Sequence, residues 1–325
     1  MTFLAFSKRL SNPLYFDVPK GFPKPEYQFK NNPLTEEGFQ LGRHLFYDPM
    51  LSRDNTISCA SCHLQATGFT HVDHELSHGI EGRIGTRNSL TLQNLAWNKN
   101  FMWDGGVNHL EVQAIAPITS EVEMDETLEN VVHKLQKSEK YQILFQEAFN
   151  TNQITGQLTL KALTQFMVML KTGNSKYDQV KRKEQKFTEI EQKGYRLFKA
   201  NCASCHKEPL FTSHTFENNG LALDPTLNDF GRMKITQNPD DSLKFKVPTL
   251  RNIQFTFPYM HDGRFKTLTE VVQHYNSGII KGKTVAQQLN KPMNLSSNER
   301  TELVAFLKTL TDSEFLFNPR FSYPR

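Results

Sequence analysis

Apolar residues in this chain recur at the spacing of helices rather than at the alternating spacing of strands. In the middle of the chain, one such stripe consists of Leu160, Leu163, Phe166, Met167 and Leu170. This spacing places the five side chains on one face of a helix, and we expect the segment Gly173-Asn174-Ser175 to end that helix. Because no sustained strand pattern is present elsewhere, the sequence predicts an all-α fold.

A second apolar stripe lies near the C-terminus and consists of Leu303, Phe306, Leu307 and Leu310. Ser296 and Glu299 precede it with the spacing of a capping box, in which each side chain bonds the backbone of the other residue at a helix N-terminus. The sequence therefore predicts a last helix that begins near Ser296 and buries this stripe.

Two shorter amphipathic segments are similar to one another: residues 41–46 (LGRHLF) and residues 193–198 (KGYRLF). Thr35 and Thr188 precede these segments, and acidic residues follow each threonine. A threonine followed by acidic residues is typical of a helix N-terminus. The two segments therefore predict a matching pair of helices, one in each half of the chain.

The same pentapeptide, CASCH, follows each of these segments, at residues 59–63 and 202–206. Cys-x-x-Cys-His is the attachment sequence of c-type haem, in which both thiols bond to the porphyrin and the histidine binds the iron. A lone Cys-x-x-Cys can also be half of a zinc site or a redox dithiol, but these four cysteines are the only ones in the chain. We therefore expect two covalent haems, held by Cys59, Cys62, His63, Cys202, Cys205 and His206.

Further landmarks repeat downstream of the two pentapeptides. Arg87-Asn88 is echoed by Arg251-Asn252, and Met102-Trp103-Asp104-Gly105 is echoed by Met260-His261-Asp262-Gly263. Matched landmarks in the same order indicate an internal repeat. The sequence thus predicts a duplicated cytochrome c unit.

Length and composition agree with two domains. A chain of 325 residues is long enough for two cores, and we expect an N-terminal haem domain at residues 1–173 and a C-terminal haem domain at residues 174–325. The polar segment 174–187 is the expected linker. The net charge of +4 is small and unclustered, so no nucleic-acid partner is expected.

Covalent haem attachment indicates an extracytoplasmic, periplasmic protein. Residues 1–12 contain only a five-residue apolar run, too short for the hydrophobic region of a signal peptide, and no later stretch is apolar enough to span a membrane. We therefore expect a mature chain whose export signal or anchor lies outside this sequence.

Six further segments form a more specific pattern: residues 87–89 (RNS), 101–105 (FMWDG), 110–113 (LEVQ), 122–124 (VEM), 247–252 (VPTLRN) and 259–263 (YMHDG). In this order, and from about residue 35 to about residue 310, the chain resembles the bacterial di-haem cytochrome c peroxidases and their relative MauG, which matures methylamine dehydrogenase. The resemblance implies an oxidoreductase that reacts with hydrogen peroxide at the N-terminal haem and handles electron transfer at the C-terminal haem.

In that family the peroxide pocket contains a glutamine and a glutamate that match Gln113 and Glu123. Cleavage of the peroxide O–O bond needs a group that moves a proton from the inner to the outer oxygen, and a buried glutamate can do so. Without the motif, Glu123 would be expected to be a solvated surface acid. The resemblance also implies that Trp103 lies between the haems as an electron relay, although a buried aromatic role is compatible with the same position.

The resemblance further implies an interdomain calcium ion, bound at the positions of Asn88, Thr256 and Pro258. The ligands would be one side-chain amide oxygen and two backbone carbonyl oxygens, which are hard oxygen ligands of the kind that calcium prefers. Three such ligands would leave much of the coordination shell to water.

The chain departs from the peroxidases at the second haem. Their distal ligand is a methionine fourteen residues after the histidine of the His-Asp-Gly motif, and that position here is Tyr275, as in MauG. A thioether favours ferrous iron, whereas a phenolate favours ferric and higher states. Tyr275 can instead be an ordinary aromatic residue, with a different residue on the iron. The alternative iron ligands are Met260, Met293 and His274.

A resting ligand to the first haem iron is a further expectation, because peroxidases of this family rest with a second histidine there and MauG does not. His71, His74 and His78 all lie in the corresponding segment. His78 fits best by its local sequence, and each of the three can also be a solvated loop histidine.

Three functions follow as alternatives. The first is a hydrogen peroxide reductase that receives electrons from a small cytochrome or cupredoxin. The second is a MauG-like oxidase that uses peroxide to oxidise residues of a partner protein. The third is an electron-transfer cytochrome without catalysis, against which Gln113 and Glu123 argue. Tyr275 favours the second alternative over the first.

Overall fold

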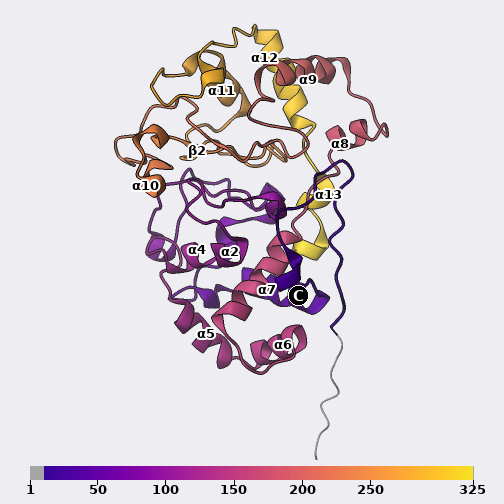
Figure 1. Ribbon diagram of the computed structural model, residues 1–325, viewed down its shortest axis with the longest axis vertical. Helices are drawn as coiled ribbons and strands as arrows, with labels where there is room; N and C mark the ends of the chain where they lie inside the picture. The colour runs from indigo at the N-terminus through magenta and orange to yellow at the C-terminus, as the bar shows by residue number, and fades with distance from the viewer. Residues whose placement is uncertain (1–10, 325) are drawn as a thin grey trace, which may run out of the picture.

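The computed structural model describes residues 11–324. The expectation about a signal peptide rests on residues 1–12, most of which lie outside the described part. The described chain forms two helical units stacked along the long axis, the N-terminal half below and the C-terminal half above (Figure 1). In residues 11–324, no helix has the length and apolar character needed to cross a membrane.

Helices dominate both units, as the apolar spacing predicted. The lower unit contains α1 (Glu36–Tyr47), α2 (Cys59–Cys62), α3 (Leu110–Gln113), α4 (Ile115–Thr119), α5 (Leu128–Gln136), α6 (Glu139–Phe149) and α7 (Gly156–Val168). The C-terminal half contains α8 (Lys176–Lys181), α9 (Glu189–Asn201), α10 (Met233–Thr236), α11 (Leu268–Gln273), α12 (Ser297–Lys308) and α13 (Ser313–Leu316). One small antiparallel sheet pairs β1 (Phe216–Glu217) with β2 (Phe245–Lys246) and sets Phe216 opposite Lys246. The all-α prediction is confirmed apart from this sheet.

The predicted helix N-termini are confirmed by their caps. The Thr35 hydroxyl accepts a hydrogen bond from the Gly38 amide at the start of α1, and Thr188 caps α9 in the same way. Ser296 and Glu299 form the predicted capping box of α12. Side chains that accept from the first free amides stabilise a helix start, so local sequence was sufficient to place these ends.

The two halves repeat one helix pair. In the lower unit α1 crosses α7, and a Cβ atom on Gly42 would lie 1.9 Å from the carbonyl oxygen of Ala162. In the upper unit α9 crosses α12, and a Cβ atom on Gly194 would lie 1.9 Å from the carbonyl oxygen of Glu302. Both crossings are too close for any side chain, which explains the glycine shared by the two amphipathic segments.

Two expectations about the middle of the chain are wrong. Helix α7 ends at Val168, several residues before Gly173, because tight turns take over from the α-helical bonds there. The expected linker, residues 174–187, contains α8, in which Tyr177 and Asp178 are buried. The Asp178 carboxylate makes a two-point ion pair with Arg251, at 2.8 Å for each bond, so this segment is anchored in the upper unit.

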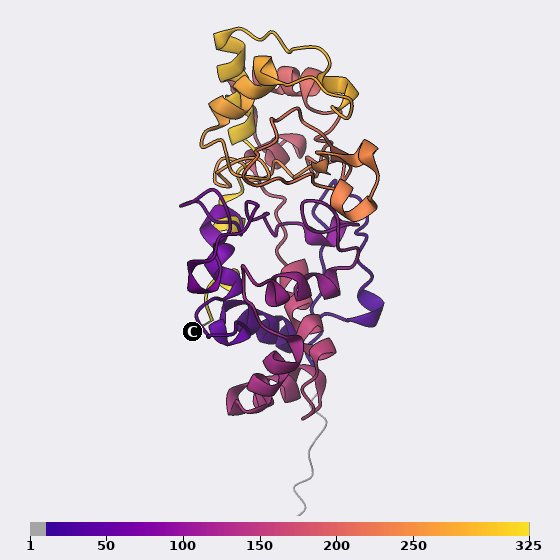
Figure 2. The same ribbon diagram turned by 90° about the vertical axis from the view of Figure 1, so that its left-hand side faces the viewer.

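The end of the chain returns to the lower unit (Figures 1 and 2). Phe315, Leu316 and Phe321 are buried in the same apolar core as Phe39 and Phe166. A separate core of the upper unit is built around the α9–α12 crossing. The two units are therefore tied together by the chain crossing between them twice.

Candidate functional site

The first CASCH sequence opens onto a cavity of about 330 Å³. Cys59 and Cys62 lie on one turn, α2, and both line this cavity together with His63. The His63 Nδ1 atom lies 2.8 Å from the carbonyl oxygen of Phe69, so Nδ1 carries the proton and donates to it. This leaves Nε2 with a free lone pair, the form of histidine that binds a metal.

The second CASCH sequence has the same local geometry. Cys202 follows the last turn of α9, and its amide donates to the carbonyl oxygen of Phe198 at 2.8 Å. The His206 Nδ1 atom lies 3.1 Å from the carbonyl oxygen of Phe211, so Nε2 is again the free nitrogen. Burial lowers the pKa of His206 to about 4, which keeps the ring neutral and able to bind iron.

The thiols themselves argue against the other uses of a Cys-x-x-Cys sequence. Burial raises the pKa of Cys59 and of Cys202 to about 12, whereas a redox dithiol needs a lowered pKa. Over residues 11–324, the groups of three or more ligand atoms with metal-binding spacing include no cysteine. Two thiols beside a histidine whose Nε2 is free fit covalent haem attachment.

Gln113 and Glu123 line the same cavity as the first CASCH sequence. Gln113 ends α3, and Glu123 follows α4 in a turn where its amide donates to the Ser120 carbonyl at 3.0 Å. The carbonyl oxygen of Glu123 accepts from the Ile80 amide at 2.8 Å, which fixes the backbone. Burial raises the pKa of the Glu123 carboxyl and so favours its protonated form.

Trp103 lies where the two units meet. Its indole nitrogen donates to the carbonyl oxygen of Asn88 at 2.8 Å, and its own carbonyl accepts from the Lys246 amide of β2 at 2.7 Å. The side chain is buried and lines the cavity. Trp103 therefore lines the same cavity as Gln113 and Glu123 and is bonded through its backbone to the upper unit.

Two titratable residues of the cavity come from the upper unit and were not singled out in the sequence. Lys246 and His214 both line the cavity, and burial lowers the pKa of Lys246 to about 7. A lysine within the small sheet looks like a surface residue in the sequence, and only the approach of the two units buries it. Its ammonium group would be stabilised by an anion in the cavity, such as a porphyrin carboxylate.

An ion cluster beside Trp103 joins the units. Arg87 bonds Asp104 of the lower unit and Asp229 of the upper unit, each at 2.6 Å. Burial alone would raise the pKa of Asp229, but the bond to Arg87 lowers it to about 2. The repeated Arg-Asn and Asp-Gly landmarks thus include residues that hold the junction.

Tyr275 lies in the upper unit beside the second CASCH sequence. It belongs to a π-helical turn, His274–Gly278, which directly continues α11. Burial raises the pKa of Tyr275 to about 12, a hydrogen bond from Asn219 opposes this shift, and the Cys202 and Cys205 thiols contribute a further electrostatic increase. The phenol is therefore in the neighbourhood of both attachment thiols, on a type of turn that occurs frequently at functional sites.

The alternative ligands of the second haem are nearby. Asn219 donates from its side chain to the Met260 sulfur at 3.3 Å, and its carbonyl oxygen lies 2.9 Å from His274 Nε2. Met293 packs at the edge of the upper core. Met260 and His274 thus already have polar partners, as does Tyr275.

The three loop histidines are stacked on one another. The ring centroids of His71 and His74 are 4.1 Å apart, and those of His74 and His78 are 3.8 Å apart. The carbonyl oxygen of His78 accepts from the Cys62 thiol at 3.3 Å, but its side chain is not among those that line the cavity. His78 is therefore close to the first attachment motif through its backbone.

The residues matched to a calcium site lie along the junction between the two units. The Asn88 amide donates to the carbonyl oxygen of His261 at 2.7 Å, and its side-chain nitrogen donates to the carbonyl oxygen of Glu75 at 2.9 Å. Thr256 lies against Gly68 of the lower unit, and Pro258 is buried. The Asn88 side-chain oxygen is the atom that a calcium site would use.

Comparisons with known proteins agree with this arrangement. Residues 36–186 match the family model described as di-haem cytochrome c peroxidase, and residues 191–311 match the cytochrome c model. The chain is 36% identical over 307 residues to the methylamine utilization protein MauG of Methylorubrum extorquens, covering 91% of this chain and 83% of that protein. It is 35% identical to the cytochrome c551 peroxidase of Nitrosomonas europaea, covering 88% and 82%.

Among solved structures, a MauG-like protein associated with microbial copper homeostasis superposes with a TM-score of 0.83 at 32% identity, covering 96% of this chain and 99% of that one. Together with the two attachment motifs, these matches assign one c-type haem to each unit. The chain belongs to the di-haem cytochrome c peroxidase family, which includes MauG.

Proposed function

We propose that this protein is a periplasmic oxidoreductase that reduces hydrogen peroxide in the cavity of the lower unit. The observation that carries this proposal is that Glu123 and Gln113 line the same cavity as Cys59, Cys62 and His63. A cytochrome that only carries electrons needs no protonatable side chain at this place. The overall reaction takes up two electrons and two protons for each peroxide and releases two water molecules.

The haem held by His63 supplies, when bound, an iron that exchanges electrons with peroxide. Glu123 is the proton-transfer group, because it lines the cavity and burial raises the pKa of its carboxyl. In its carboxylate form Glu123 would accept the proton of one peroxide oxygen, and its raised pKa makes it the stronger base. It would then deliver that proton to the other oxygen, which leaves as water, while the bound haem would supply the two electrons that this O–O cleavage requires. Gln113 donates from its side chain to the Met102 sulfur at 3.8 Å, which leaves its amide oxygen to orient the substrate.

Trp103 is the proposed relay between the two haems. Its ring lines the cavity, and its backbone is bonded to β2 of the upper unit, so it is held by both sides of the junction. An oxidisable indole at this position shortens the path for electrons. Electrons would enter through the upper unit from a small cytochrome or cupredoxin.

A calcium ion at the junction is part of the proposal. It would be bound by the side-chain oxygen of Asn88 and by the backbone carbonyl oxygens of Thr256 and Pro258, with water completing the shell. Its support is that Asn88 and the loop containing Thr256 lie on opposite sides of the same junction.

A second function is favoured by Tyr275. Tyr275 would hold the second iron as a phenolate, with the iron displacing the phenol proton whose pKa burial raises to about 12. A phenolate would stabilise oxidised states of iron and make the upper haem a poor electron acceptor from a small cytochrome. The protein would then use peroxide to oxidise residues of a partner protein, as a MauG-like oxidase. The π-helical turn that holds Tyr275 near both thiols supports this assignment.

The test uses the protein matured with both haems. Peroxide consumption is measured with a reduced small cytochrome or cupredoxin as the only electron source, and in parallel without any donor. Donor-dependent turnover supports the peroxidase, whereas rapid peroxide reaction with slow donor oxidation supports the MauG-like oxidase. A holoprotein whose haem spectra do not respond to peroxide would contradict both.

A further inference from the structure

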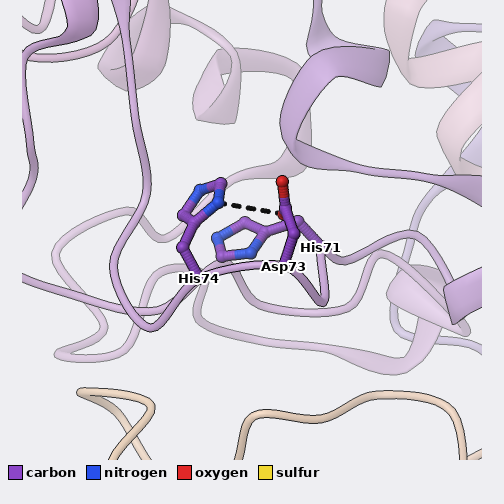
Figure 3. Close-up of side chains that lie close together, drawn as sticks. All are labelled: His71, Asp73 and His74. Atoms are coloured by element: carbon purple, nitrogen blue, oxygen red, sulfur yellow. Dashed lines mark ion pairs between the residues drawn. The ribbon is translucent and has the colours of Figure 1, made fainter.

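A group of metal-ligand side chains lies outside the haem site, in the loop that follows the first CASCH sequence. His71, Asp73 and His74 each present one ligand atom, and these atoms lie within 4.8 Å of one another. Figure 3 shows the rings of His71 and His74 next to one another, with a dashed line that joins the Asp73 carboxylate to a nitrogen of the His74 ring. The Asp73 oxygen lies 2.9 Å from His74 Nδ1.

This group is unusual because its buried nitrogens have no hydrogen-bond partner. His71 is 1% exposed, and neither of its ring nitrogens has a partner. His74 Nε2 is buried and also lacks one. A buried polar atom without a partner costs about 1–3 kcal/mol, so a structure that leaves three such atoms in one place calls for a ligand.

We propose that His71, Asp73 and His74 bind a divalent transition-metal ion of the zinc type. Two imidazoles and one carboxylate form a donor set typical of zinc, with metal–nitrogen distances of about 2.0–2.1 Å. Ligand atoms on one such ion lie at most about 4 Å apart, so a modest side-chain rotation completes the site. Asp73 is free to move because its side chain is 75% exposed, and one of the two stacked histidine rings must also turn so that its nitrogen faces the ion. A water molecule would fill the fourth position.

The site borders the haem cavity without lining it: none of its three ligands lines that cavity, and His71 is near enough to His63 for an electrostatic interaction. His71 and His74 are thereby assigned to the new ion, which leaves His78 as the candidate resting ligand of the first haem iron. The site lies at the junction of the units: the next residue, Glu75, accepts from Asn88 through its carbonyl oxygen and pairs with Lys266 at 3.5 Å. The His78 ring stacks on His74, and its carbonyl contacts the Cys62 thiol. A bound ion would therefore fix the loop that connects the first attachment motif to the upper unit.

The test uses the protein with both haems, treated with chelator and then titrated with zinc chloride in the presence of excess calcium. Calorimetry and elemental analysis should give one zinc per chain in addition to two irons. X-ray absorption at the zinc edge, which iron does not obscure, should show two imidazole ligands and oxygen. These readouts do not depend on peroxide activity.

The variants His71→Ala and Asp73→Asn should each weaken zinc binding at least ~10-fold, since even the partners of metal ligands are worth 10–100-fold. His133→Ala is the matched control, because His133 is exposed on α5 and should leave binding unchanged. If His71→Ala disturbs the fold, the exposed Asp73→Asn decides alone. No zinc beyond surface binding, or unchanged affinity in Asp73→Asn with intact haem spectra, overturns the proposal.

Discussion

The two haem-attachment sites have nearly the same frame and different surroundings. In each, a glycine lets two helices touch, a CASCH sequence follows, and the histidine Nδ1 donates to a nearby backbone carbonyl. The lower site faces a cavity with Glu123 and Gln113, whereas the upper site has Tyr275 on a π-helical turn. The two units share the helix pair and the CASCH sequence that hold a haem. They differ in the residues that face the haem site from the other side.

This difference shows which residues decide the chemistry. The attachment residues lie within five positions of one another, but Glu123 and Tyr275 are each about sixty to seventy positions from the cysteines of their own site. A distal residue can therefore be exchanged without disturbing the helix pair that binds the haem. A proton donor suits a peroxide site, and a phenolate suits a site that stores oxidising equivalents.

The largest expected effect comes from removing one of the two haem-attachment sites. The double variant Cys202→Ala with Cys205→Ala should carry one covalent haem instead of two, because both thioether bonds of the upper site are lost. Mass spectrometry of the matured protein measures this directly. Donor-fed turnover should disappear, while the lower haem still responds to peroxide.

A double variant that still carries two covalent haems would contradict the attachment assignment. So would a wild-type protein with metal ions, instead of haem, on its cysteines. The single-haem protein also isolates the lower site for the comparisons that follow.

The next effect concerns the lower site only. Glu123→Gln should bind both haems but react with peroxide at least ~100-fold more slowly, the usual scale for losing a proton-transfer group. Stopped-flow spectroscopy of the ferric protein measures the rate. Glu121→Gln is the matched control, since Glu121 is exposed two positions away. Equal rates for the two variants would remove Glu123 from the mechanism.

The sequence predicted the helix starts and the haem-attachment residues well, because both depend on contacts between residues that are close in the sequence. Thr35 and Thr188 cap helices through bonds to residues three positions away, and CASCH is contiguous. Lys246 could not be found in this way, since it is buried only when β2 meets Trp103.

Long-range contacts account for the errors as well. The segment 174–187 looks like a linker from its polar composition, but Asp178 is buried because Arg251, 73 positions away, compensates its charge. Phe315 and Phe321 pack in the lower core because the chain turns back after α12. Glu123, Gln113 and Tyr275 were located through motifs of the family, since composition alone makes Glu123 a surface acid.

The upper site can be converted toward the peroxidase pattern. If Tyr275 is a phenolate ligand, Tyr275→Met should raise the potential of that haem by roughly 0.1 V or more, within the range that axial ligands control. Redox titration measures the shift, and a sulfur-to-iron charge-transfer band should appear only in the variant. Tyr275→Phe, which lacks a ligand atom, is the control.

A wild-type spectrum that already shows methionine ligation, with ready reduction of one haem by ascorbate, would contradict Tyr275 as the ligand. It would leave the ordinary peroxidase as the function.

The smallest expected effect tests how firmly the two sites are held together. Asp229 has 1% side-chain exposure, and the bond to Arg87 outweighs burial and lowers its pKa to about 2, below the value near 3.9 of an unfolded chain. A carboxyl with a lowered pKa stabilises the fold above pH 4, and this contribution is lost as the pH falls from about 4 to about 2.

Asp229→Asn should therefore lower the free energy of unfolding by about 2 kcal/mol at pH 7 and by much less near pH 2. Urea unfolding across this range measures the difference, and Asp240→Asn, which breaks an exposed pair with Lys283, should change little. A pH-independent effect of Asp229→Asn would mean that packing at the junction, rather than this ion pair, holds the two sites in place.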